Sequence, residues 1–197
     1  EQAKYREFKE SRAGAADYMS MEGEFSRYLE DVYSAEPVER EVLSDECDVL
    51  VVGAGFAGLL LWHKLRAAGF QNVRFCEKGG DVGGTWYWNR YPGARCDVES
   101  LQYSYSFDDD LQQDWEWTER YAGQPEILKY AQHVSTRFHL TDLIDFNTNV
   151  ESMSYGAEEQ QWTVSTNSLT YKAKFVIAAT GCLSSTNLPD FPGLEQF

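Results

Sequence analysis

Three glycines, Gly53, Gly55 and Gly58, form a G-x-G-x-x-G pattern that follows an apolar run and precedes a segment with helical spacing. In such a pattern the first glycine permits a tight turn, the second lets the backbone approach a pyrophosphate, and the third allows close helix–strand packing. A helix that begins there presents free N–H groups and a partial positive charge to phosphate oxygens. The spacing predicts that residues 53–58 bind the diphosphate of a dinucleotide.

Glu77 is the second residue that indicates chemistry, because it stands 19 positions after Gly58 at the end of the next apolar run. A carboxylate at this position accepts hydrogen bonds from both hydroxyls of an adenosine ribose and repels a 2′-phosphate. The bound dinucleotide is therefore expected to be FAD or NAD, not NADP. The alternative is a glycine-rich turn without a ligand, and the strand, helix and acid in this order favour dinucleotide binding over it.

Hydrophobic periodicity indicates the elements that must position these residues. Residues 48–52 and 73–77 are typical of buried parallel strands, and residues 57–68 of the helix between them. Pro125 is expected to begin a helix that runs to about Phe138. Residues 79–107 are interpreted as a long ordered loop, and Asp108-Asp-Asp110 as a solvated loop.

The last third of the sequence predicts five short strands. An antiparallel meander is expected first, followed by a buried parallel strand that ends in Ala-Thr-Gly. The expected strands are 144–148, 150–155, 162–166, 169–173 and 175–179. Together with the strand–helix–strand unit they predict an α/β fold, a Rossmann-like FAD/NAD(P)-binding domain with a parallel sheet plus an antiparallel β-meander.

Residues 81–97 favour flavin over nicotinamide as the partner of the first glycine loop. Gly83 and Gly84 are adjacent, so the backbone there can lie flat against a second section of the cofactor. The aromatic residues that follow can shield a ring system from water. An NAD enzyme would normally continue at this point into another helix and strand.

The stretch GGTWYWNRYPGARCD, residues 83–97, closely resembles the FAD domain of the Baeyer–Villiger monooxygenases, the phenylacetone and cyclohexanone monooxygenase type. Plain flavin-containing monooxygenases share only its Gly-Gly-x-Trp element. The resemblance covers the chain from about residue 47 to the end, and its other matching segments are 99–107, 115–121, 124–127, 179–184 and 187–194.

This resemblance implies specific binding residues and a domain organisation. The residues implied to bind FAD are Gly53, Gly55, Ala57, Gly58, Glu77, Gly84, Thr85, Trp86, Tyr87, Trp88, Asp97, Tyr103 and Val150. Arg95, Cys96 and Asp97 match a segment that in the family also lies near NADPH. No metal site is expected. An acidic, partly helical extension (1–46) would precede the FAD-binding domain (47–181), and residues 182–197 would begin a linker toward an NADPH-binding domain outside this chain.

The resemblance also implies an activity, that of an NADPH- and O₂-dependent monooxygenase that converts ketones to esters or lactones through a flavin C4a-peroxide. Asp97 matches a family carboxylate that orients a catalytic arginine, and this arginine is expected outside the chain, so the chain alone is expected to be inactive. A simple helix cap before a helix near Glu99 is an alternative role for Asp97. Two other functions stay open: a related N- or S-oxygenating flavin monooxygenase, or a catalytically incompetent flavin-binding fragment.

Composition limits the partners. The 197 residues carry 17 basic and 32 acidic side chains, a net charge of −15, which argues against nucleic acid and anionic membranes as partners. The first 46 residues hold 13 of the acids, and Phe25, Tyr28, Leu29 and Val32 in this extension have the spacing of one helical face. Four scattered cysteines indicate reduced thiols and a cytoplasmic protein. The remaining partner expected is the rest of a longer polypeptide.

Overall fold

The computed structural model describes residues 20–34, 46–184 and 186, which belong to two compact units. The first unit comprises residues 1–30 and 185–197, and its described part contains a 3-10 helix, η1 (Gly23–Leu29), with no buried residue. The expectation that Val32 continues this helical face is wrong, because the backbone becomes extended at Glu30. Most of the expected extension and linker lies outside the described residues.

The second unit, Asp31–Ser184, is built on one mixed sheet with the strand order β3-β2-β1-β6-β5-β4. Parallel pairs join β3, β2, β1 and β6, and antiparallel pairs join β6, β5 and β4. The strands are β1 (Glu46–Val52), β2 (Val73–Cys76), β3 (Ile144–Asp145), β4 (Val150–Gly156), β5 (Gln161–Thr166) and β6 (Thr170–Ala178). The predicted α/β class, a parallel sheet with an antiparallel meander, is confirmed.

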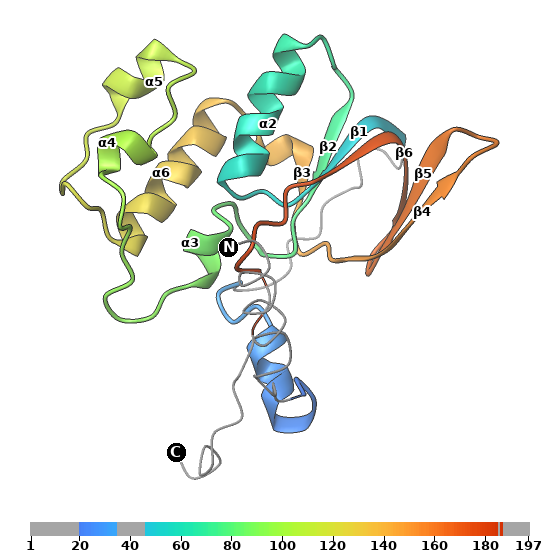
Figure 1. The fold of residues 1–197 in the computed structure, drawn as a ribbon, viewed down its shortest axis with the longest axis horizontal. Coiled ribbons are helices and arrows are strands. Elements are labelled where there is room, and N and C mark those ends of the chain that lie inside the picture. Colours follow the sequence, from blue (N-terminus) through green and yellow to red (C-terminus); the bar gives the residue numbers. More distant parts are fainter. Residues whose placement is uncertain (1–19, 35–45, 185, 187–197) are drawn as a thin grey trace, which may run out of the picture. The chain divides into compact units, whose positions relative to one another are not determined.

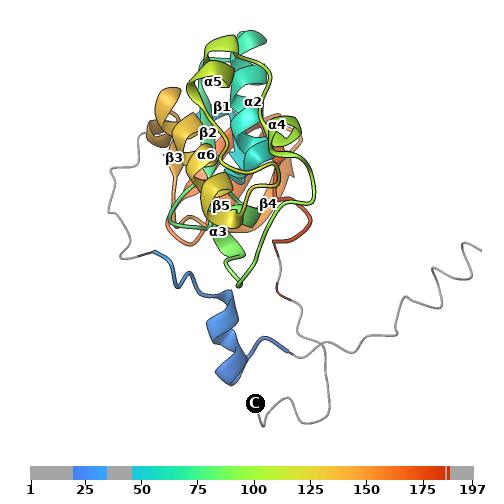
Figure 2. The same cartoon turned by 90° about the vertical axis from the view of Figure 1, so that its left-hand side faces the viewer.

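Two helices cover one face of this sheet. Figure 1 shows α2 (Phe56–Ala67) and α6 (Gln124–Arg137) on the same side of β1, β2 and β6, and in Figure 2 they lie in front of the strands. Val49 and Val51 of β1 and Phe75 of β2 are buried in one apolar cluster with residues of both helices. Because β1 is paired on both edges and buried on both faces, it needs the continuous apolar run that the sequence shows.

The segment between β2 and α6 is more helical than expected. It contains three short helices, α3 (Thr85–Trp88), α4 (Ser100–Tyr103) and α5 (Asp109–Asp114), and a further 3-10 turn, η2 (Thr141–Leu143), follows α6. The interpretation of 108–110 as a solvated loop is wrong, because the Asp108 carboxylate accepts a hydrogen bond from the Leu111 N–H (2.7 Å) and caps α5. None of the helices in the described residues is long and apolar enough to cross a membrane.

The strands of the last third differ from the expectation in two ways. Residues 169–173 and 175–179 are not separate strands, since β6 pairs antiparallel with β5 through its first half and parallel with β1 along most of its length. Lys174 fits within it because its side chain points outward to Asp48 (2.6 Å). Of residues 144–148 only Ile144 and Asp145 form a strand, which pairs with β2 and stands outside the meander.

Candidate functional site

The glycine loop, residues 53–58, joins the end of β1 to α2 and leaves no room for a side chain at Gly53 or Gly58. A Cβ atom on Gly53 would lie 2.6 Å from the Ala179 carbonyl oxygen, at a φ of +107° that favours glycine. A Cβ atom on Gly58 would lie 2.1 Å from the Gly53 carbonyl oxygen. These contacts hold the first turn of α2 directly against the end of the sheet, as the glycine spacing predicts.

The first turn of α2 has the properties of an anion-binding helix end. Gly55 is the N-cap and offers no side-chain acceptor to the first N–H groups, which have no partner within a helix. The first turn carries no acidic residue, so no carboxylate of its own neutralises the positive end of the helix dipole. Ala57 is exposed at this end and leaves the backbone accessible. A phosphate group fits these donors.

A second backbone segment, Gly83-Gly84, lies against the glycine loop. The Gly83 N–H donates to the Ala54 carbonyl oxygen (3.2 Å), and a Cβ atom on Gly84 would lie 2.9 Å from the Gly55 Cα atom. Gly84 has a φ of +55° and forms the N-cap of α3. Two glycines from different parts of the sequence, Gly55 and Gly84, therefore meet at the end of β1 without side chains between them.

Glu77 is buried immediately after β2 and is tied to the same loop. Its side chain accepts hydrogen bonds from the Ala54 N–H (2.7 Å) at Oε2 and from the Gly79 N–H (2.8 Å) at Oε1. Burial raises the pKa of Glu77, and the two amide hydrogen bonds oppose this shift. A carboxylate has about four acceptor positions. The Ala54 and Gly79 amides therefore use two of these positions and leave two.

Tyr103 contacts both the aromatic helix α3 and the N-terminal end of α2. The Trp86 indole N–H donates to the Tyr103 hydroxyl (2.9 Å), and the Tyr103 ring contacts Phe56 with centroids 5.0 Å apart. Trp86 and Tyr87 are buried, whereas Thr85 and Trp88 are half-buried. The structure thus brings together Gly84, all four α3 residues and Tyr103 beside the glycine loop.

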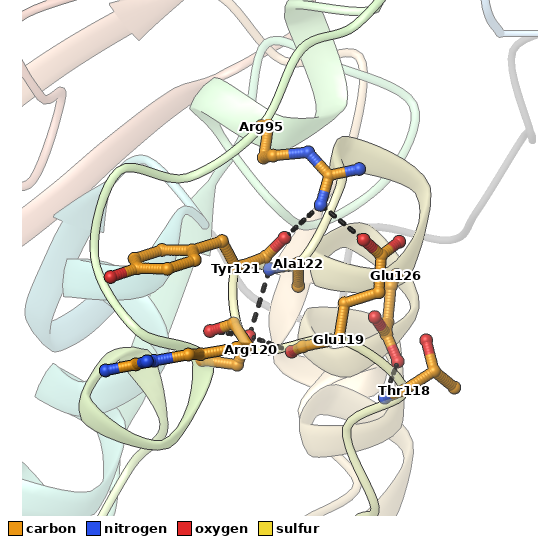
Figure 3. A network of polar contacts seen from close by, with 8 residues as sticks. Arg95, Thr118, Glu119, Arg120, Tyr121, Ala122 and Glu126 are labelled. Carbon is orange, nitrogen blue, oxygen red and sulfur yellow. Dashed lines mark hydrogen bonds and ion pairs between the residues drawn. The ribbon is translucent and has the colours of Figure 1, made fainter.

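Residues 94–100 and 118–124 run side by side and are joined by backbone hydrogen bonds, among them that from the Cys96 N–H to the Ala122 carbonyl oxygen (3.1 Å), and by the side-chain contacts in Figure 3. The Arg95 guanidinium donates to the Glu119 carboxylate (2.5 Å) and to the Tyr121 carbonyl oxygen. The Ser100 hydroxyl donates to the Glu119 carbonyl oxygen (2.8 Å) and accepts from the Ala122 N–H (3.0 Å). These contacts give the segment that carries Cys96 and Asp97 a defined path.

Gln124 is a site residue that the sequence reasoning missed. Its side-chain amide donates to the Trp86 carbonyl oxygen (2.5 Å), and its N–H donates to the Ala94 carbonyl oxygen (2.9 Å). Gln124 is buried at the first position of α6. Its place in the resembling segment 124–127 was the only available signal, since spacing alone does not connect it to Trp86.

Three of the residues expected to bind a cofactor, Asp97, Cys96 and Val150, lie apart from the contact between the glycine loop and α3. Asp97 is exposed, and it does not cap α4, whose N-cap is Glu99, so the alternative role is wrong. Cys96 is buried in the cluster that contains Trp86. Val150 begins β4 two residues after Thr148, whose N–H donates to the Glu77 carbonyl oxygen (2.8 Å). The segment that leads into β4 therefore contacts Glu77, and FAD binding by Val150 stays a prediction.

The parallel β1–α2–β2 unit, the glycine loop and the buried Glu77 define a Rossmann-type dinucleotide-binding protein. The family model described as pyridine nucleotide-disulphide oxidoreductase matches residues 50–197, and the chain belongs to this family. The resemblance to the N-terminal part of Baeyer–Villiger monooxygenases is confirmed by relatives that carry this name.

One such relative is a Baeyer–Villiger monooxygenase of Streptomyces coelicolor, 40% identical over 198 residues, or 98% of this chain and 32% of the relative. Another relative, phenazine N-monooxygenase of Lysobacter antibioticus, is 42% identical over 76% of this chain and 28% of its own length. A solved structure of oxidised steroid monooxygenase bound to NADP matches with 52% identity and a TM-score of 0.71, covering 76% of this chain and 29% of that one. The chain thus spans about a third of the length of these relatives.

Proposed function

We propose that this chain is the FAD-binding N-terminal part of an NADPH- and O₂-dependent Baeyer–Villiger monooxygenase that converts ketones to esters or lactones. The observation that carries the proposal is the contact between Gly55 and Gly84, which brings the α2 end and the aromatic α3 to one place. The site fits the cofactor, because side chains are excluded where a diphosphate must approach and free donors are present there.

Each residue of the site has a definite task in this proposal. Gly55, Ala57 and Gly58 would present backbone N–H groups to the diphosphate, whereas Gly53 would form the tight turn, because its own N–H donates to the Cys76 carbonyl oxygen (2.8 Å). Glu77 would accept the ribose hydroxyls, with Val150 nearby. Gly84, Thr85 and the aromatic residues of α3, with Tyr103, cover the flavin ring and exclude water. Bound FAD, with electrons from NADPH, would supply the O₂ activation that this chain's own side chains lack.

Asp97 is the residue of this chain proposed to act closest to the chemistry. Its exposed carboxylate belongs to the segment held by the Arg95 and Ser100 contacts, and it would orient an arginine supplied from outside the chain. Arg95 and Cys96 would lie near NADPH. Because Arg95 already donates to Glu119 and Tyr121, we expect it to support this segment rather than bind phosphate directly.

A specific relative favours a second candidate, oxygenation of nitrogen. The phenazine N-monooxygenase matches over 76% of the chain, so the residues present here are compatible with both reactions. The ketone and N-oxygenation proposals therefore share the FAD site and differ in the substrate.

The test uses the complete protein that contains these residues. We expect it to bind FAD, to consume NADPH when ketones are added, and to form esters or lactones identified by mass spectrometry. Formation of N-oxides from aromatic nitrogen heterocycles, with no ester or lactone from any ketone, would favour the second candidate. A protein that binds FAD but forms none of these products would favour a catalytically incompetent flavin-binding fragment, and a protein that binds no FAD would refute all three possibilities.

We also propose a cytoplasmic location and a set of partners for the protein. The four cysteines are free thiols, which suits the reducing cytoplasm, and the net charge of −15 does not suit nucleic acid or an anionic membrane. The partners proposed are a small ketone, O₂ and the remainder of a longer polypeptide. Fractionation of the source cells, with the protein followed by antibody, tests the cytoplasmic location.

A further inference from the structure

A short segment far from the glycine loop in sequence, Asp31–Ser34, lies directly on the α3 region, and we refer to it as the strap. One carboxylate oxygen of Asp31, Oδ2, accepts hydrogen bonds from the Tyr87 hydroxyl (2.7 Å) and from the Gly80 N–H (2.8 Å). The other, Oδ1, accepts from the N–H groups of Tyr33 (2.9 Å) and Ser34 (3.2 Å). Asp31 thus connects the strap, the turn after Glu77 and α3.

Aromatic and cationic contacts strengthen this connection. The Tyr33 ring meets the Tyr87 ring edge-on, with centroids 6.0 Å apart and planes at 85°. The Arg90 guanidinium lies 3.9 Å from the Tyr33 centroid and 4.9 Å from the Tyr87 centroid, and its Nε donates to the Tyr87 carbonyl oxygen (2.8 Å). Tyr87 is therefore held at its hydroxyl, its ring and its backbone.

The strap also fits closely against the turn that follows Glu77. A Cβ atom on Gly80 would lie 2.7 Å from the Ser34 Oγ atom, so the two segments pack without a side chain on Gly80. The preceding residue, Gly79, donates its N–H to Glu77 (2.8 Å). The strap is thus one residue away from an amide that fixes the Glu77 carboxylate.

The pKa shifts of Asp31 and Tyr87 favour the hydrogen bond between them. Partial burial raises the pKa of Asp31, but hydrogen bonds from Tyr87, Tyr33, Gly80 and Ser34 together outweigh it and lower the pKa below its ordinary value. Burial, followed by the bond to Asp31, raises the pKa of Tyr87. At neutral pH the carboxylate is an anion and the hydroxyl keeps its proton, so the hydrogen bond is charge-assisted.

We propose that Asp31 is a positioning residue of the flavin site, which fixes Tyr87 and Gly80 so that α3 and Glu77 hold the geometry that binds FAD. This inference rests on the proposed function. None of the sequence motifs includes Asp31. The competing explanation is that the strap only anchors the N-terminal segment and does not affect the cofactor.

The test compares Asp31→Asn with Asp142→Asn in the complete protein. In Asn an NH₂ group, which cannot accept a hydrogen bond, replaces one carboxylate oxygen, so the donors at one of the two Asp31 oxygens lose their acceptor. Asp142 is the matched control, since its side chain is exposed on the η2 turn. Two quantities are measured: hydrogen exchange of the amides of residues 80–90 in the apoprotein, and the dissociation constant of FAD from its fluorescence.

We expect Asp31→Asn to raise both the exchange rates and the FAD dissociation constant about tenfold, the scale of one lost hydrogen bond to a charged group. The visible circular dichroism of bound flavin should also change, whereas Asp142→Asn should change nothing. In a Tyr87→Phe background the Asp31→Asn effect should be smaller, because the shared hydrogen bond is already absent.

Each other outcome overturns a defined part of the inference. Unchanged exchange at residues 80–90 would show that Asp31 does not hold α3, whatever the affinity for FAD. Faster exchange with an unchanged FAD dissociation constant would show that the strap is only an anchor. If the unmutated protein binds no FAD, the proposed function fails and the flavin part of the inference fails with it, while the exchange data still decide whether the strap fixes α3.

Discussion

The Gly84 and Gly55 backbones are in direct contact, since a methyl group on Gly84 would lie 2.9 Å from the Gly55 Cα atom. Gly84 also has a φ of +55°, which other residues adopt only with strain. The contact joins the N-terminal end of α2, where Gly55 is the N-cap, to the N-terminal end of α3, where Gly84 is the N-cap. Both glycines are therefore needed for their size, and Gly84 for its conformation as well.

Gly84→Ala is expected to abolish detectable FAD binding and to lower the free energy of unfolding by about 1–3 kcal/mol. The reason is that the methyl group must push the two backbone segments apart. Gly69→Ala is the matched control, because Gly69 also has a positive φ (+92°) but nothing lies within 4 Å of its Cβ position. Urea unfolding and FAD titration measure the two effects. Equal FAD affinity in both variants would contradict the close-contact interpretation.

The stability of the apoprotein should depend on the ionisation of Glu77. Burial raises its folded-state pKa above the ordinary value of 4.5, so the folded protein takes up this proton at a higher pH than the unfolded chain. The Glu77 contribution to stability is thus fully present below about pH 4.5 and is lost as the pH rises through the raised folded-state pKa. Glu77→Gln, which mimics the neutral acid, should not show this loss.

Denaturant unfolding at several pH values measures the difference between Glu77→Gln and the unmutated apoprotein. Glu158→Gln, an exposed change in the turn between β4 and β5, should leave the pH profile unchanged. A parallel profile for Glu77→Gln and the unmutated protein would mean that Glu77 is not destabilised as an anion.

The strap should weaken at acid pH. Because the folded-state pKa of Asp31 is lowered below its ordinary value of 3.8, its contribution is fully present above that pH and is lost as the pH falls through the lowered folded-state value. Above pH 4 the unmutated protein should therefore be more stable than Asp31→Asn. The stability difference, measured by thermal unfolding of the apoprotein, should shrink in strong acid. A difference that is independent of pH would contradict the role of the charge.

The buried ion pair of Arg74 and Asp145 (2.6 Å) should be important for folding, since both side chains are almost inaccessible to solvent. Asp145 also accepts a hydrogen bond from the Tyr171 hydroxyl (2.5 Å). Asp145→Asn leaves the Arg74 charge unpaired and should lower the free energy of unfolding by about 3–5 kcal/mol. Asp48→Asn, which breaks the exposed pair with Lys174, should have a far smaller effect in the same urea experiment.

Local patterns were sufficient to predict much of the nucleotide-binding unit. The apolar run of β1, the glycine spacing and the helical periodicity of α2 are properties of neighbouring residues, and the structure has these elements within one or two residues of the expected bounds. Patterns were less reliable in the last third. The single long β6 appeared as two strands because Lys174 interrupts the apolar run, and only the pairing with β1 and β5 keeps the strand continuous.

The sequence by itself determined the glycine loop, the position of Glu77 and the family, because these depend on residue types at short, regular spacings. Only the tertiary structure decided that Gly84 touches Gly55, that Gln124 holds Trp86 and that Asp31 binds Tyr87. Such contacts join residues far apart along the chain. They form only once the sheet and its helices have packed, and no local pattern encodes which distant partner a given side chain will meet.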